Sequence, residues 1–284
     1  MRAILTLAGL TLKEAARRRV FLAAALVAGL FVVFAFLPMP IRTGPLVGLT
    51  MDEARDTTGK VFAWMGCGTI KFFASVLAVT LAAGSITAEV ERGVLSTIVP
   101  KPLARWQIYL GKWLGLLTLL AVSVAVWGGL LAWGIWRQTG TFHPRLFCGV
   151  LAAALFPLLF TTLTLFFSSF ATSALSAGLA LIAAGVALAE DTLLLLSRPF
   201  FLDSPTLATL SRVVGCIVPL GRMNHWITRG LDGAGRDVTA FPLFNPNGPG
   251  EAAVATTQGD MVYILVYIAA FLALGLVIFQ RRDL

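Results

Sequence analysis

The amino-acid sequence predicts an all-α integral membrane protein with six transmembrane helices and an amphipathic helix before them. Hydrophobic residues make up 58% of the 284 residues and charged residues only 13%, about half the share of roughly 25% found in soluble domains. Several uncharged runs are long enough to cross a bilayer, which takes roughly 20 apolar residues in a helix. The net charge of +8 comes mostly from lysines and arginines at the ends of these runs, where anionic lipid headgroups explain them without nucleic acid.

We interpret residues 1–284 as one transmembrane domain. The first segment, 1–19, places polar and apolar residues on opposite sides of a helix, so we expect it to lie in the headgroup plane. Pro38-Met39-Pro40 follows the first apolar run without a small-residue cleavage site, so a cleaved signal peptide is not expected. The six spans are predicted at 20–37, 61–88, 106–136, 146–170, 172–190 and 261–279.

Three ionisable residues are predicted near the outer ends of the second and fifth spans. Lys71 lies inside the second span, which we expect to run inward from Val61 to Ala88, and counting back about 20 residues places it near the outer interface. There a lysine can extend its ammonium group to water. Glu190 and Asp191 end the fifth span at a similar depth. These three residues are candidates for an outer gate or a substrate contact, with an outer-surface ion pair as the alternative.

The fourth and fifth spans are predicted to form a tight hairpin, because the turn at 168–173 is short and uncharged. Thr161, Thr164 and Ser168 share one face of the fourth span. They either line a pathway or donate hydrogen bonds to carbonyl groups of their own helix or of a neighbouring one. The fifth span is rich in small residues, which makes it a candidate packing or dimer surface.

Residues 191–260 are predicted to lie on the outer side of the membrane. Their semi-apolar piece, 207–220, is too short to span and is interrupted by Arg212 and Pro219. We therefore expect re-entrant or surface helices in this region. Both chain termini are predicted to be cytoplasmic, because the N-terminal helix, the loop 89–105 and the last residues carry most of the lysines and arginines.

The charged loop at 89–105, between the second and third spans, has the most informative pattern in the chain. Glu89–Val99 has an apolar and a polar side at helical spacing. Pro100 removes a backbone donor and ends that helix, and Pro102 favours extended geometry at the residue before it. We therefore predict a short helix under the membrane, joined to the third span by a stiff corner.

The loop and the start of the following helix combine an acidic boundary with several Gly and Pro pairs: Glu89, Glu91, Arg92-Gly93, Lys101-Pro102, Arg105 and Gly111-Lys112. This pattern resembles the membrane permeases of ABC-2 type ABC exporters, in the branch that includes copper-enzyme-maturation permeases. The resemblance extends to an N-terminal helix that ends in Arg17-Arg18-Arg19 and to the final segment, Phe279–Leu284.

The resemblance implies a permease subunit of an exporter in the inner or plasma membrane, working with two cytoplasmic ABC ATPases and with a second permease copy or paralogue. ATP and Mg would bind the ATPase, and no cofactor is expected in this chain. The turn at 168–173 would offer the ATPase a second, smaller contact. The residues expected to couple the permease to the ATPase are Glu89, Glu91, Arg92, Gly93, Pro100, Pro102 and Arg105.

Motifs for independent chemistry are absent from the sequence. It contains no GxxxxGK[ST] phosphate loop, no HExxH and no GxSxG, and its three cysteines are too widely separated for a metal site. Active work would therefore need energy from another chain. Two alternatives stay open: a mechanical or assembly subunit that acts on an outer partner through 191–260, and an ion-coupled carrier or membrane enzyme. The second alternative would need acid or base groups near the bilayer midplane, where the predicted spans carry none.

Overall fold

The computed structural model describes residues 2–17, 21–22, 26, 29–30, 51–86, 104–140, 144–196, 205–231 and 258–281. Within these ranges the regular structure is entirely helical, which confirms the predicted all-α class. The helices are α1 (Arg2–Arg17), α3 (Met51–Ala83), α6 (Arg105–Thr139), α7 (Arg145–Ala153), α8 (Leu155–Ser168), α9 (Ser173–Leu196), α10 (Pro205–Ile217), α11 (Leu220–Gly230) and α13 (Gln258–Arg281).

Four helical stretches of the described residues are long and apolar enough to cross a bilayer. They are Gly59–Ala83, Arg105–Thr139, Arg145–Ser168 and Gly259–Arg281, and they coincide with the second, third, fourth and sixth predicted spans. The fifth predicted span falls on α9. The apolar stretch found there, Ser173–Val186, is shorter than the four stretches above. Most of the first predicted span lies outside the described residues. The structure therefore establishes a multi-pass helical bundle.

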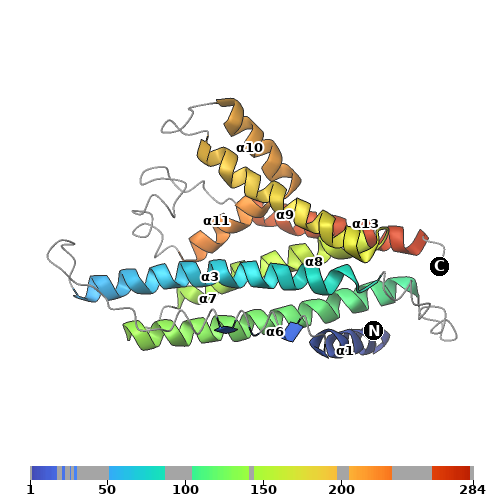
Figure 1. Cartoon of the computed structure of the whole chain (residues 1–284), viewed down its shortest axis with the longest axis horizontal. Coiled ribbons are helices and arrows are strands. Elements are labelled where there is room, and N and C mark those ends of the chain that lie inside the picture. The colour runs from blue at the N-terminus through green and yellow to red at the C-terminus, as the bar shows by residue number, and fades with distance from the viewer. Residues whose placement is uncertain are drawn as a thin grey trace.

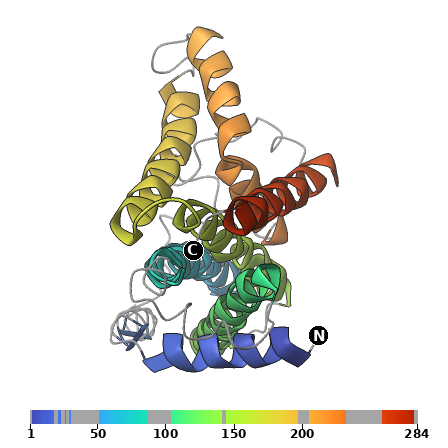
Figure 2. The ribbon, with the colours of Figure 1, turned by 90° about the vertical axis from the view of Figure 1, so that its right-hand side faces the viewer.

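The membrane helices run side by side, and the remaining helices attach to this bundle at different levels. α3, α6 and the α7–α8 pair extend along the long axis (Figure 1). α1 lies crosswise against α6 at one end of the bundle (Figure 2). α9 and α10 pack together and project away from the other helices (Figure 1). We call the end that holds Ala83, Arg105 and Ser168 the α1 end.

Small residues allow the helices of the bundle to approach closely. Ala74, Ala78 and Ala82 recur at four-residue spacing on α3 and have no exposed surface. Gly66, on the same helix, lies where an added Cβ would collide with the Leu131 side chain of α6. In lipid, where helix association depends on van der Waals contact, such residues mark the packed faces.

Helix α3 differs from the prediction at both ends. It begins at Met51 and ends at Ala83, whereas the sequence predicted a helix from Val61 to Ala88. Hydropathy identifies only the part of a helix that crosses the membrane, and a polar stretch can continue the helix into water, as residues 51–60 do here. Residues 84–86 form a turn, so the cytoplasmic loop predicted from 89 onward begins earlier.

The fourth predicted span is interrupted near its middle. α7 ends at Ala153 and α8 begins at Leu155, whereas the sequence predicted one helix over 146–170. Pro157 explains the break, because it has no N–H group and its ring clashes with the carbonyl group four residues earlier, that of Ala153. The turn that follows α8 is as short as predicted, since α9 starts at Ser173.

Two short helices, α10 and α11, occupy part of the region predicted to lie outside the membrane. The break between them falls at Val218-Pro219, as expected for a proline that cannot donate a backbone hydrogen bond. Arg212, in contrast, does not interrupt α10. Tyr263 and Tyr267 of α13 donate hydrogen bonds to the last carbonyl groups of α10, at 2.6 and 2.8 Å.

Candidate functional site

The predicted ATPase-coupling segment connects α3 to α6. Of its residues, 89–103 lie outside the described part of the chain, but the structure describes both attachment points, the turn 84–86 after α3 and Ala104 before α6. Arg105 is the first residue of α6. The predicted coupling residues that lie outside the described residues are Glu89, Glu91, Arg92, Gly93, Pro100 and Pro102.

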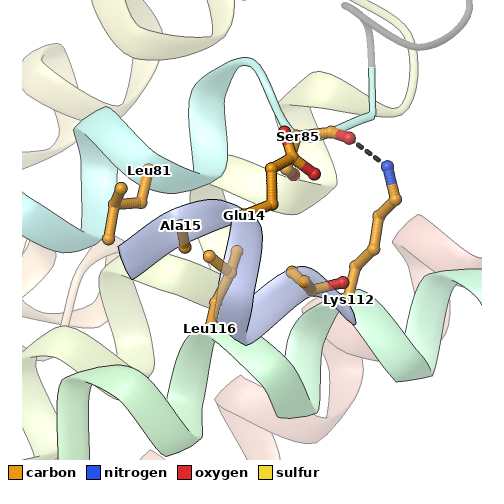
Figure 3. Close-up of a pocket in the computed structure, with 7 residues that line it drawn as sticks. Glu14, Ala15, Leu81, Ser85, Lys112 and Leu116 are labelled. Carbon is orange, nitrogen blue, oxygen red and sulfur yellow. Dashed lines mark hydrogen bonds between the residues drawn. The ribbon is translucent and has the colours of Figure 1, made fainter. Parts of the chain in front are cut away.

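A buried lysine joins the two attachment points. Lys112, on the second turn of α6, is 6% exposed, and its Nζ donates a hydrogen bond to the carbonyl oxygen of Ser85 (Figure 3). The Ser85 hydroxyl group in turn donates to the carbonyl oxygen of Ala82 at 2.8 Å. The last carbonyl groups of a helix have no partner within the helix and carry the negative end of its dipole. An ammonium group at this position therefore stabilises the end of α3 and fixes its distance from α6.

Two serines from the hairpin between α8 and α9 bind the same end of α3. Ser168 and Ser176 are fully buried, and their hydroxyl groups donate to the carbonyl oxygen of Ala83 at 3.2 and 3.1 Å. The Ser176 hydroxyl group shares its hydrogen with the carbonyl oxygen of Ser173, at 2.9 Å. The turn at 168–173, predicted as a second contact with the ATPase, is thus anchored to α3. These bonds connect the end of α3 to α6, α8 and α9.

Helix α1 closes the junction from one side. Gly115 of α6 lies so close to α1 that an added Cβ would be 2.7 Å from the carbonyl oxygen of Ala8 and 2.8 Å from Cβ of Thr11. Ala15 is 3% exposed. The sequence predicted a helix in the headgroup plane and did not predict this packing, because the pattern of α1 does not reveal which helix covers its apolar side.

A small cavity of about 10 Å³ lies where α1, α3 and α6 meet, a volume near that of one water molecule. Its polar lining comes from Thr11, Glu14, Ser85 and Lys112. Figure 3 shows the Glu14 carboxyl group close to Ser85, on the side opposite Lys112. Sequence analysis did not identify Glu14, although a carboxylate in an otherwise basic helix is a signal that could have drawn attention to it.

Arg105 has a contact within the protein. Its Nη1 donates to the carbonyl oxygen of Gln280, in the last turn of α13, at 3.3 Å. One turn later Tyr109 is fully buried against Gly275 and faces Phe279, with ring centroids 6.0 Å apart. The start of α6 and the end of α13 are therefore held together beside the coupling segment.

The hydroxyl groups of the fourth span donate to carbonyl groups of their own helix or of α3. Thr161 and Thr164 are fully buried and donate to the carbonyl oxygens of Pro157 and Phe160 at 2.6 and 2.7 Å. With Ser168 bonded to α3, the face that sequence analysis considered as a pathway lining is a packed surface.

Lys71, a predicted gate residue, lies closer to the end of its helix than the sequence predicted. It is twelve residues before the end of α3, or about 18 Å at 1.5 Å per residue, because that helix ends at Ala83 rather than Ala88. Its Nζ donates to Oδ1 of Asn224 on α11 and lies 5.2 Å from the ring centroid of Phe156. Glu190 and Asp191 belong to α9, and their side chains lie outside the described residues.

The helical bundle with four apolar spans defines an integral membrane protein, and its family follows from comparison with known proteins. A family model described as ABC-2 family transporter protein matches residues 5–284. The chain therefore belongs to the ABC-2 transporter family, and the predicted resemblance to ABC-2 type permeases is confirmed. No curated protein matches the chain. Membership makes the chain a permease subunit of an ABC transporter, a membrane transport component.

Proposed function

We propose that this chain is the permease of an exporter in the cell membrane, driven by two cytoplasmic ABC ATPases and paired with a second permease copy or paralogue. ATP and Mg would bind the ATPases, since the sequence of this chain carries no phosphate loop. One six-span subunit supplies only half of the wall that a pathway needs, which favours a paired assembly. Membership of the ABC-2 family supports the ATPase partnership.

The coupling element of this proposal is the segment 89–105, acting through Glu89, Glu91 and Arg92. The observation that carries the proposal is the hydrogen bond from Lys112 to the Ser85 carbonyl oxygen, because it joins the two helices to which the segment is attached. A force on the segment then moves α3 and α6 as one unit, and the serines of the α8–α9 hairpin extend that unit to two more helices.

The proposed topology has six spans, with α1 and both chain termini on the cytoplasmic side. The lysines and arginines of 1–19, of 89–105 and of the last residues support this orientation. In this orientation α11 is a re-entrant helix that reaches Lys71 from the outer side, through Asn224. Lys71, Glu190 and Asp191 are retained as the proposed outer gate or substrate contact.

Co-purification with ABC ATPases encoded in the same genome tests the proposal. The intact chain is compared with a Glu89→Ala, Glu91→Ala, Arg92→Ala variant and with Arg137→Ala, an exposed residue at the far end of α6. We expect an ATPase to accompany the intact chain and the Arg137→Ala control, and to be weakened or uncoupled in the triple variant. Failure of the intact chain to retain any ATPase would contradict the partnership. A change in ATP turnover with substrate would distinguish a transporter from a mechanical subunit.

A further inference from the structure

A groove of about 820 Å³ opens between α6, α7, α8, α11 and α13. Its volume is within the range of pockets that hold small molecules, roughly 300–1,000 Å³. Most of its wall is aliphatic, with Leu117 and Val124 from α6 and Leu151 and Leu158 from α7 and α8. The described residues that line it include no carboxylate.

The groove follows one half of the bundle. Leu158 lies ten residues before the end of α8 at the α1 end, and Arg145 begins α7. At 1.5 Å per residue these positions are about 15 and 35 Å from that end. The hydrocarbon core of a bilayer is about 30 Å thick. The groove therefore extends from mid-depth to the headgroup level of the leaflet farther from α1.

Cationic and hydrogen-bonding groups gather at the headgroup end of this groove. Arg145 and Arg229 both line it, and the Arg229 guanidinium group lies 5.3 Å from the ring centroid of Trp226. The indole Nε1 of Trp226 is buried and has no hydrogen-bond partner among the described residues. A buried donor without an acceptor is unfavourable, but this atom is covered by protein, so what the end of the groove offers to a ligand is the positive charge of the two arginines.

The position of the two arginines is fixed by close helix packing. An added Cβ on Gly230 would lie 3.0 Å from the backbone carbon of Cys148, and one on Gly149 would lie 2.7 Å from the Leu231 side chain. The backbones of α7 and α11 are therefore in contact one turn from Arg145 and next to Arg229. The cationic end is part of the packed structure and does not depend on a flexible loop.

We propose that this groove binds an anionic phospholipid from the leaflet farther from α1. The phosphate group would accept charge-assisted hydrogen bonds from Arg145 and Arg229, a pairing that suits guanidinium groups. The ester groups, just below the phosphate, would lie beside the Trp226 ring, which lines the groove. An acyl chain would lie along the aliphatic wall toward Leu158. This site concerns a lipid bound by the permease itself and does not depend on the ATPase partnership.

The test uses the full chain, purified in a zwitterionic detergent and incubated with phosphatidylglycerol or with phosphatidylcholine of the same acyl chains. Native mass spectrometry counts the retained lipids, and thermal unfolding measures the stabilisation that they give. The intact chain is expected to prefer phosphatidylglycerol. The Arg145→Gln, Arg229→Gln double variant should lower that preference by about tenfold, the scale of one charged hydrogen bond. Arg212→Gln, an exposed arginine on α10 outside the groove, is the control and should leave the preference unchanged.

Two further variants test the wall. Ala121→Phe fills the groove and should reduce retention of both lipids, whereas Val122→Phe, next to it on the exposed side of α6, should not. Equal lipid preference in the double variant and in Arg212→Gln would overturn the proposal. A second pair of results would also overturn it: no lipid preference in the intact chain, together with a dimer that Ala121→Phe disrupts. The groove would then hold a second copy of the chain.

Discussion

The Nζ atom of Lys112 and the carbonyl oxygen of Ser85 form the bond that closes the α1 end of the bundle. Ser85 follows α3 and Lys112 belongs to α6, so the two residues hold together the helices that flank the proposed coupling segment. The charge of the lysine and its burial both contribute, because a hydrogen bond from a charged group is stronger than a neutral one and this bond is shielded from water.

Replacing Lys112 with Met is expected to destabilise the protein. The change removes a charged, buried hydrogen bond to the end of α3, a loss of about 1.5–3 kcal/mol. Thermal unfolding in detergent measures the effect, and Lys13→Met, an exposed lysine on α1, is the matched control. An unfolding temperature for Lys112→Met equal to that of the control would show that the bond contributes little.

Gly115→Ala is expected to separate α1 from α6. The new methyl group would meet backbone atoms of Ala8, which cannot yield as a flexible side chain does, and overpacking of this kind costs about 1–3 kcal/mol. Gly129→Ala on the same helix is the control, because its Cβ meets nothing within 4 Å. The control should be neutral or more stable by up to about 1 kcal/mol through helix propensity. Thermal unfolding checks the prediction, and Gly115→Ala should unfold at a lower temperature than Gly129→Ala. A higher unfolding temperature for Gly115→Ala would refute the packing of α1 against α6.

Ser168→Ala and Ser176→Ala are each expected to cost about 1 kcal/mol, the typical net value of a neutral hydrogen bond. Because both hydroxyl groups donate to the carbonyl oxygen of Ala83, the effects of the two changes should not add, and a double-mutant cycle measures the coupling. Thr118→Ala is the control, because it removes an exposed hydroxyl group that bonds the Leu114 carbonyl oxygen of its own helix. It should change the free energy of unfolding by no more than about 0.5 kcal/mol. Strict additivity would contradict a shared acceptor.

Asn224→Leu is expected to be more harmful than Lys71→Met. The first change withdraws an acceptor from an ammonium group inside an apolar helical stretch, whereas the second removes the charge itself, whose burial at the centre of a membrane helix costs about 2.5–3.5 kcal/mol. The Lys71→Met, Asn224→Leu double variant should therefore recover part of the stability lost in Asn224→Leu. Thermal unfolding of the three variants gives the comparison. A double variant less stable than Asn224→Leu alone would place Lys71 in a different environment.

The sequence predicted helices best where charged residues bound an apolar run. The third span was predicted at 106–136 and the sixth at 261–279, and the structure has α6 from Arg105 to Thr139 and α13 from Gln258 to Arg281. The early start of α3 was missed because its first turns are polar. The break between α7 and α8 was missed although Pro157 carries the signal for it, since a proline excludes the hydrogen bond that a continuous helix needs there.

The contacts between residues of the candidate site could not be predicted from the sequence. Lys112 was identified only as part of a family-like Gly-Lys pair, and neither Ser85 nor Ser176 was identified at all. Ser176 and Ala83 are 93 positions apart in the chain, so their contact depends on how three helices pack. No local pattern encodes that packing. The predicted position of Lys71 along its helix was also in error. Because α3 ends five residues earlier than predicted, Lys71 lies about 7 Å closer to the end of the helix.

Site-specific photo-crosslinking tests most directly whether residues 89–105 contact an ATPase. A photoreactive amino acid replaces Arg92 in the full chain, in cells that also produce the ATPases of the same genome, and Arg137 at the far end of α6 carries the probe as a control. The proposed function predicts a cross-linked product of permease and ATPase from position 92 and none from position 137. The absence of such a product from position 92, or its formation from position 137 instead, would contradict a coupling segment at the α1 end.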